Sequence, residues 1–422
     1  MKPVRRVFLV GGALTPFIGK SHPDFIWKGH ADFGKRENPT LEQYFEMVLA
    51  QLFAETGVEP GRVEKGYVGN FAGELFNKQG HLGSMPARVE RRLEGVPFAR
   101  VEGACASGAL AIIGAIEAIQ AGRNLTLAVG AEAQTTVSAR EGADFLARAS
   151  HYESERGLDD FTFPAMFARR TMHCRAATGV TEEDVAHVVV KAYANAAKNP
   201  NAHMKAVPMS FEVAATASDR NPNFLKNPEL NPFLKISDCS QVSDGAAAVL
   251  LASEEGLRAL GMSPDDAVEI LSYAQANGGL GHVADFTRMS VTARAADEAY
   301  ADTGLKPSDM KVAEVHDCFA ITELLMTEAL GFAGHGKGGA LAREGRTAIS
   351  GDIPVNTGGG LLAFGHPVGA TGIKQVLEVA RQMQGKCGDY QVGHAIRHGV
   401  AANMGGDDRT AVVTLLRNNA AV

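Results

Sequence analysis

Apolar positions along the chain follow two spacings, one typical of helices and one typical of buried strands. Residues 44–53 place apolar side chains three and four positions apart, which predicts a helix, and the short run 66–69 after it predicts a strand. The same order recurs at 295–300 and 312–315. Helices that alternate with short apolar strands predict parallel sheets covered on both faces.

A repeated turn sequence indicates that the chain is duplicated. Residues 54–60 read Ala-Glu-Thr-Gly-Val-Glu-Pro, and residues 301–307 read Ala-Asp-Thr-Gly-Leu-Lys-Pro. Each copy joins a predicted helix to a predicted strand. After each strand comes a Gly/Ala-rich segment that opens a long helix, at 102–121 and at 358–384. The pattern therefore predicts an α/β protein with two tandem βαβαβ-type halves related by a pseudo-twofold axis.

The segment 137–235 fits neither copy. It has few strand-like runs, several Asn-Pro pairs, which favour turns and end helices, and one helical pattern around 181–195. We interpret it as an inserted, partly irregular loop domain that could cover a binding cleft. The first half is then formed by 1–136 with 236–262, and the second half by 263–422.

Composition and charge narrow the function classes. Hydrophobic residues make up 45% and charged residues 21% of the chain, which excludes disorder and fibres. The net charge of -7 argues against a nucleic-acid partner, although a local Arg/Lys cluster can still hold phosphates. No apolar run reaches 18 residues, so no membrane span is predicted. Five widely spaced cysteines without a C-x-x-C pair indicate free thiols in a reducing compartment, and we expect a cytoplasmic protein.

Cys105 is the first candidate for chemistry. It stands in the small-residue segment 104–108, on a predicted strand-to-helix turn. The free N–H groups and the dipole of a helix N-terminus stabilise a thiolate, so we expect the pKa of this thiol to be lowered. The alternative is an inert buried cysteine, which the small neighbours make less favourable because they leave room for a carbonyl substrate.

Two further turns of the same kind carry imidazoles. His316 and Cys318 follow the strand of the second half, and His366 lies in a Gly-His-Pro sequence that opens the second long helix. Taken singly, each also fits a structural hydrogen bond or a capping loop. Together with Cys105 they indicate nucleophilic catalysis. No other His or Cys has partners at ligand spacing, so no metal site is predicted.

These motifs resemble those of thiolases, in the order of the family and along nearly the whole chain. They are Cys-Ala-Ser-Gly at 105–108, Ser-Asp-Gly-Ala-Ala-Ala at 243–248, His-Asp-Cys-Phe at 316–319 and Gly-His-Pro at 365–367. The His-Asp-Cys-Phe version is similar to that of the sterol-carrier-protein-type 3-ketoacyl-CoA thiolases. Commoner thiolases carry an Asn-Glu-Ala-Phe-like sequence there and a second catalytic cysteine in a late Cys-x-Gly loop. Here that loop reads Asn-Met-Gly-Gly at 403–406, and in this subtype Cys318 supplies the missing thiol.

The resemblance implies a thiolase fold in α/β/α/β/α layers and an acyltransferase of lipid metabolism. It would cleave 3-ketoacyl-CoA with CoA to acyl-CoA and acetyl-CoA, or run the reverse Claisen condensation, through an acyl-cysteine. Cys105 would be the nucleophile, His366 would generate its thiolate, and Cys318 would act as acid and base. His316 and His366 would form one oxyanion hole, and the N–H groups of Cys105 and Gly405 the other.

The resemblance also implies partners. Coenzyme A is a substrate, no cofactor is held permanently, Ser240 would touch the pantetheine arm, and a homodimer or homotetramer is expected. The residues that bind the CoA phosphates do not transfer, because 137–235 has no motif that aligns. Two alternatives remain open. One is a decarboxylating ketoacyl-synthase-like enzyme, which Cys318 disfavours because decarboxylation needs no α-proton base. The other is a thiolase-like protein that needs a small acyl-CoA-binding partner for aldol cleavage or acyl transfer to a non-CoA acceptor.

Overall fold

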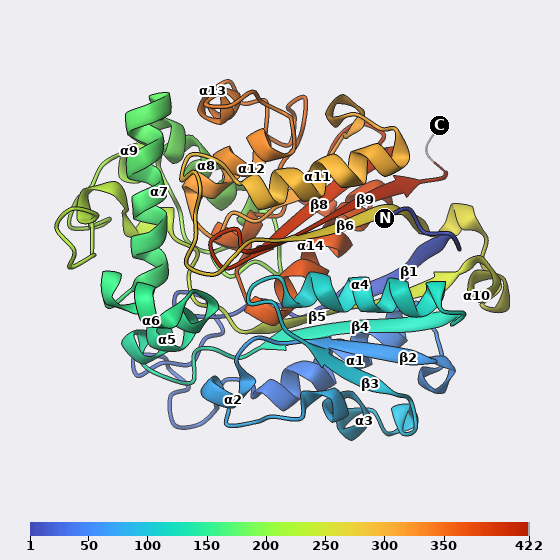
Figure 1. Cartoon of the computed structure of the whole chain (residues 1–422). Coiled ribbons are helices and arrows are strands. Elements are labelled where there is room, and N and C mark those ends of the chain that lie inside the picture. The colour runs from blue at the N-terminus through green and yellow to red at the C-terminus, as the bar shows by residue number, and fades with distance from the viewer. Residues whose placement is uncertain (421–422) are drawn as a thin grey trace.

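One mixed sheet of nine strands runs through the computed structural model, which describes residues 1–420 (Figure 1). Its strand order is β3-β2-β4-β5-β1-β6-β9-β8-β7. The strands are β1 (Val7–Leu14), β2 (Lys65–Gly69), β3 (Phe98–Val101), β4 (Leu125–Glu132), β5 (Gly245–Ser253), β6 (Val268–Asn277), β7 (Ala313–Val315), β8 (His398–Gly405) and β9 (Thr410–Asn418). The helices are α1 (Leu41–Thr56), α2 (Gly73–Phe76), α3 (Met85–Val89), α4 (Ser107–Gln120), α5 (Ala139–Leu146), α6 (Tyr152–Glu155), α7 (Thr162–Thr178), α8 (Glu182–Ala196), α9 (Phe211–Ala215), α10 (Glu254–Ala259), α11 (Ser290–Thr303), α12 (Ala320–Ala329), α13 (Gly338–Arg343) and α14 (Val368–Met383).

The sheet has two halves of matching topology, which confirms the predicted duplication. The order β3-β2-β4-β5-β1 in the first half is mirrored by β7-β8-β9-β6 in the second, and the two halves join where β1 pairs with β6. The counterpart of β3 is reduced to a single parallel bridge between Ala313 and Val355. Parallel pairing was expected throughout. It holds for β2 with β3 and β4 and for β7 with β8, but it is wrong for β1, β5, β6 and β9, which pair antiparallel.

The repeated turn sequence has the same structure in both halves. α1 ends at Gly57 with φ 65°, and α11 ends at Gly304 with φ 71°. A residue with this left-handed backbone closes a helix with least strain when it is glycine. Each turn then leads through a short 3₁₀ segment into a strand, β2 or β7, as the sequence predicts.

Two helices, α4 and α14, pack on each other between the two halves of the sheet (Figure 1). Their backbones meet closely because glycines stand where they cross. A Cβ on Gly108 of α4 would lie 2.7 Å from the carbonyl oxygen of Gly369, and one on Gly372 of α14 would lie 2.3 Å from the nitrogen of Ala109. The loops that open the two helices are therefore brought side by side, and these loops carry the candidate cysteine and one candidate histidine.

The segment 137–235 is more helical than expected. It contains α5 to α9, gathered at one end of the sheet, and none of the nine strands (Figure 1). α8 confirms the helix predicted around 181–195. α7 was not predicted, because it buries four consecutive residues, 165–168, and a helix enclosed on several sides shows no single apolar stripe. The domain boundaries stay a prediction.

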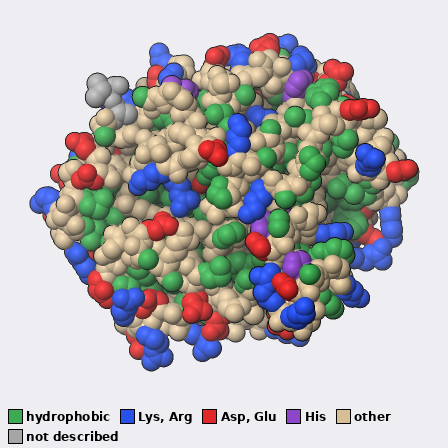
Figure 2. All heavy atoms as spheres, turned by 180° about the vertical axis from the view of Figure 1, so that it is seen from behind, with side chains coloured by type: hydrophobic (Ala, Val, Ile, Leu, Met, Phe, Trp, Pro, Cys, Tyr) green, Lys and Arg blue, Asp and Glu red, His purple; other side chains and the backbone are tan. Residues whose placement is uncertain are grey.

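Acidic and basic side chains are interspersed on the face seen from behind (Figure 2). Within residues 1–420, no helix combines the length and the apolar character needed to cross a bilayer.

Candidate active site

A cavity of ≈480 Å³ brings the candidate residues together. Cys105, Cys318, His366 and Ser240 all lie on its wall. Much of the rest of the wall is apolar and comes from the inserted segment: Ala139, Ala143, Leu146, Ala149, Phe161, Phe163, Pro164 and Phe224. The inserted segment therefore lines this cavity, and its role in covering a binding cleft stays a prediction.

A strained turn presents Cys105. The preceding residue, Ala104, has φ 52°, a left-handed backbone that a residue with a side chain adopts at a cost of about 1–2 kcal/mol. Ser107, the first residue of α4, stabilises this turn from both sides. Its hydroxyl donates to the carbonyl of Ala104 at 2.6 Å and accepts the N–H of Gly103 at 3.1 Å. The turn sets the cysteine directly before the helix, as the sequence predicts.

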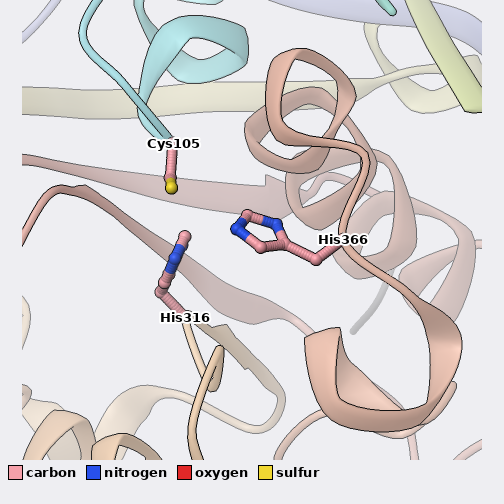
Figure 3. Close-up of side chains that lie close together, drawn as sticks. All are labelled: Cys105, His316 and His366. Carbon is pink, nitrogen blue, oxygen red and sulfur yellow. The ribbon is translucent and has the colours of Figure 1, made fainter. Parts of the chain in front are cut away.

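The cysteine of the first half meets two histidines of the second. Sγ of Cys105 and one ring nitrogen from each of His316 and His366 all lie within 4.8 Å of one another. The two imidazole rings are perpendicular, with centroids 5.1 Å apart, and both point toward the sulfur (Figure 3). The structure thus brings together three residues that are far apart in the sequence. Their chemical roles stay predictions. So does the expectation of no metal, since three such atoms are spaced as metal ligands can be.

A threonine fixes the protonation pattern of His366. Thr371 Oγ1 donates its single proton to the carbonyl of Pro367 at 2.9 Å, and it lies 2.7 Å from His366 Nδ1. The hydroxyl must therefore accept from Nδ1–H, which leaves Nε2 as the unprotonated nitrogen of the ring. The backbone of His366 is held by Ser243, whose Oγ accepts the His366 N–H at 3.1 Å. Ser243 opens the sequence motif at 243–248.

Burial makes the resting cysteine and histidine neutral. It raises the pKa of Cys105 to about 12, and it lowers the pKa of His366 to about 3, with a further lowering by the charge of Lys374. The expectation of a lowered thiol pKa was wrong. Loss of water around the thiolate outweighs the hydrogen bond that the Gly406 N–H offers to the sulfur.

Cys318 lies on the same cavity wall and is only 6% exposed. Burial raises the pKa of its thiol well above the ordinary value and lowers the pKa of His316 well below its own. The carbonyl of Cys318 accepts the N–H of Ser240 at 2.9 Å, so the loop with the predicted pantetheine contact is attached to the loop that carries Cys318.

Glycines at the end of β8 complete the wall next to Cys105. A Cβ on Gly405 would lie 2.0 Å from the carbonyl oxygen of Gly103, so only glycine fits there. The N–H that approaches the sulfur belongs to the next residue, Gly406, which also lines the cavity and was not selected from the sequence. The predicted oxyanion role of Gly405 stays a prediction.

Glu132 is a second residue that the sequence analysis missed. It is buried at the end of β4 and accepts N–H groups of Phe71, Ala72 and Gly369, as well as Nδ2 of Asn70, at 2.9–3.1 Å. It thereby ties the loop after β2 to the start of α14. The only sequence signal is a single acidic residue at the end of an apolar strand.

A duplicated α/β sheet that brings a cysteine on the wall of an apolar cavity together with two histidines is typical of enzymes that transfer acyl groups. The chain matches the "Thiolase, N-terminal domain" family model over residues 30–255 and the "Thiolase C-terminal domain-like" model over residues 272–418. The protein therefore belongs to the thiolase family, as the motifs implied.

Individual relatives agree with this assignment. The chain is 39% identical to an acetyl-CoA acetyltransferase of Methanothermobacter thermautotrophicus, over 85% of this chain and 90% of the relative. It is 30% identical to sterol carrier protein 2 of Oryctolagus cuniculus, over 99% of this chain and 73% of the relative. Its fold is similar to a solved structure titled "Ltp2-ChsH2(DUF35) aldolase", with a TM-score of 0.75, 23% identity and 98% of each chain covered.

Proposed function

We propose that this protein is a thiolase that cleaves 3-ketoacyl-CoA with CoA to acyl-CoA and acetyl-CoA, and that also catalyses the reverse condensation. The observation that carries the proposal is the convergence of Cys105, His316 and His366 within 4.8 Å. The acetyl-CoA acetyltransferase relative at 39% identity supports the same reaction.

In the first half-reaction, Cys105 gives its proton to Nε2 of His366, and its sulfur attacks the 3-keto carbon. The carbon–carbon bond to the α-carbon breaks, and Cys318 protonates the acetyl-CoA carbanion as it leaves. Cys105 now carries the acyl group as a thioester. In the second half-reaction, the Cys318 thiolate takes the proton of a new CoA thiol, whose sulfur attacks the thioester carbon. The bond from that carbon to the Cys105 sulfur breaks, the Cys105 thiolate takes its proton back from Nε2 of His366, and acyl-CoA leaves. Protons and bonds balance over the cycle, and no permanently held cofactor is needed.

Two sets of donors stabilise the oxygens that become negative. We assign His316 and His366 to the oxygen of the acetyl-CoA enolate, and the N–H groups of Cys105 and Gly405 to the tetrahedral intermediate. One such donor is worth about 3–4 kcal/mol of the barrier. Ser240, on the cavity wall, is the proposed contact for the pantetheine arm of coenzyme A.

The setting of the enzyme is also proposed. We infer a homodimer or homotetramer that works in the cytoplasm on fatty acyl or related lipid substrates. Five free cysteines, all within the described residues, support a reducing compartment. The apolar wall contributed by the inserted segment supports an acyl chain as the group that fills the cavity.

A second candidate function needs a partner. One solved structure with a similar fold is titled "Ltp2-ChsH2(DUF35) aldolase". In that alternative, the present chain would hold an acyl-CoA for aldol cleavage, or for acyl transfer to a non-CoA acceptor, together with a small acyl-CoA-binding protein.

One assay separates the two. The purified protein alone, mixed with acetoacetyl-CoA or longer 3-ketoacyl-CoAs and free CoA, is expected to form acetyl-CoA, while Cys105→Ser forms none. Product is quantified by liquid chromatography. Cleavage only after a partner protein is added would replace the thiolase proposal with the alternative.

A further inference from the structure

A chain of buried amide groups ends on His316. Nε2 of Gln375 donates to the carbonyl of Ala402 at 3.2 Å, and Oε1 of the same side chain accepts from Nδ2 of Asn403 at 2.9 Å. That Asn403 Nδ2 also lies 2.9 Å from Nδ1 of His316. All three side chains are at most 2% exposed, so water does not compete for these bonds.

The Ala402 carbonyl determines which group donates and which accepts in each hydrogen bond of this series. The Ala402 carbonyl can only accept, so the NH₂ group of Gln375 must face it. The oxygen of Gln375 then faces Asn403, and the NH₂ group of Asn403 must donate to it. Turning either amide over would set two oxygens against each other without water. Because Nδ1 of His316 receives a donor, it carries no proton, and the proton of the neutral ring is on Nε2.

That Nε2–H is free for a ligand. Nε2 of His316 is buried and has no hydrogen-bond partner within residues 1–420. The ring faces Cys105 and His366 (Figure 3). A buried donor without a partner is costly unless a ligand oxygen accepts from it.

We propose that Gln375 and Asn403 are positioning residues that hold His316 as an N–H donor aimed at the substrate oxygen. His366 is held in the opposite form by Thr371, with its Nε2 free to accept a proton. The site thus contains one imidazole that gives a hydrogen bond and one that takes a proton, and different side chains fix each. The catalytic part of this inference rests on the proposed function, whereas the protonation pattern does not.

Nitrogen NMR of the intact, substrate-free protein tests the pattern directly. With ¹⁵N-labelled histidine, protonated and unprotonated ring nitrogens of a neutral imidazole resonate in separate regions. His316→Gln and His366→Gln assign the signals. We expect His316 to carry its proton on Nε2 and His366 on Nδ1. A proton on Nδ1 of His316 in the wild-type protein would overturn the proposal without any variant.

Two variants test which residues set the pattern. Asn403→Asp replaces the donor with a group that only accepts, so the proton of His316 should move to Nδ1. Gln375→Met removes the oxygen that orients Asn403 and should give a mixture of the two forms. Thr371→Ser keeps both bonds of Thr371 and serves as the matched control with unchanged spectra. If Asn403→Asp does not fold, Gln375→Met and the wild-type spectrum still decide.

The variant that moves the proton of His316 to Nδ1 should also have a lower kcat. In Asn403→Asp, kcat is expected to fall about 10²–10³-fold, the loss typical of one oxyanion donor, while KM changes only a few-fold. Unchanged His316 signals in both variants would refute the positioning role. A wild-type protein with the expected spectrum but no thiolysis would instead refute the proposed function and leave the positioning of the ring intact.

Discussion

The loops after β2 and β7 occupy equivalent places in the two halves of the molecule, but their polar side chains differ in how completely they are hydrogen-bonded. Gly69 at the end of β2 pairs with Gly130, and Val315 at the end of β7 pairs with Ala402, so the next residues, Asn70 and His316, correspond.

The loop after β2 leaves no polar group of Asn70 unused. Its Nδ2 donates to the Ala131 carbonyl and to Glu132, and its Oδ1 accepts the N–H of Gly73, all at 2.9 Å. After β7, His316 uses Nδ1 for Asn403, while Nε2 has no partner within the described residues. A fully satisfied polar network stabilises the fold, whereas an unsatisfied buried donor costs stability and is available to a ligand. The same topology thus supplies a structural connection in one half and a reactive group in the other.

Changing Cys318 to alanine should have the largest effect. It gives the second loop the residue that Ala72 supplies at the corresponding place in the first. Loss of the general acid and base is expected to lower kcat for thiolysis and for condensation by about 10²–10⁴-fold. Cys105 should still become acetylated by acetyl-CoA, which intact-protein mass spectrometry detects.

Cys239→Ala is the matched control, because Cys239 lines the same cavity and is similarly buried. It should retain nearly wild-type activity. Normal CoA-dependent turnover by Cys318→Ala would show that the second loop is no more reactive than the first.

Changing Glu132 to glutamine should act on stability. Each carboxylate oxygen accepts two N–H groups, and the amide nitrogen of glutamine would leave two of these donors buried without acceptors. We expect the free energy of unfolding to fall by about 2–4 kcal/mol in urea titrations.

His316→Asn copies Asn70 into the second half. It should lose activity, and its free energy of unfolding should fall less than that of Glu132→Gln. The comparison between the loops fails if the two variants exchange these effects.

The sequence was informative where local chemistry decides the structure. Gly57 and Gly304 marked the repeated turns, and the strand-to-helix turns carrying Cys105 and His366 were recognised from their small neighbours. What it could not reveal are bonds between distant residues. Glu132 contacts Gly369, which is 237 positions away, and no spacing pattern in the sequence predicts such a pair. The raised pKa of the cysteine was missed for the same reason, because burial depends on the assembled cavity.

The protonation state of Cys105 gives the last test of the difference between local and assembled chemistry. A cysteine considered only with its helix N-terminus would be a thiolate near neutral pH and would react at a rate independent of pH. In the assembled site, burial raises its pKa to about 12 and lowers the pKa of His366 to about 3, so no imidazolium stabilises the thiolate between pH 6 and 9.

Below the thiol pKa, the thiolate fraction rises about tenfold per pH unit. The rate at which iodoacetamide alkylates Cys105, followed by peptide mass spectrometry, should therefore rise continuously across this range. Cys105→Ser corrects for the other thiols. A rate that levels off near neutral pH would show that the helix N-terminus and the Gly406 N–H dominate over burial, and that the resting enzyme already holds its nucleophile as a thiolate.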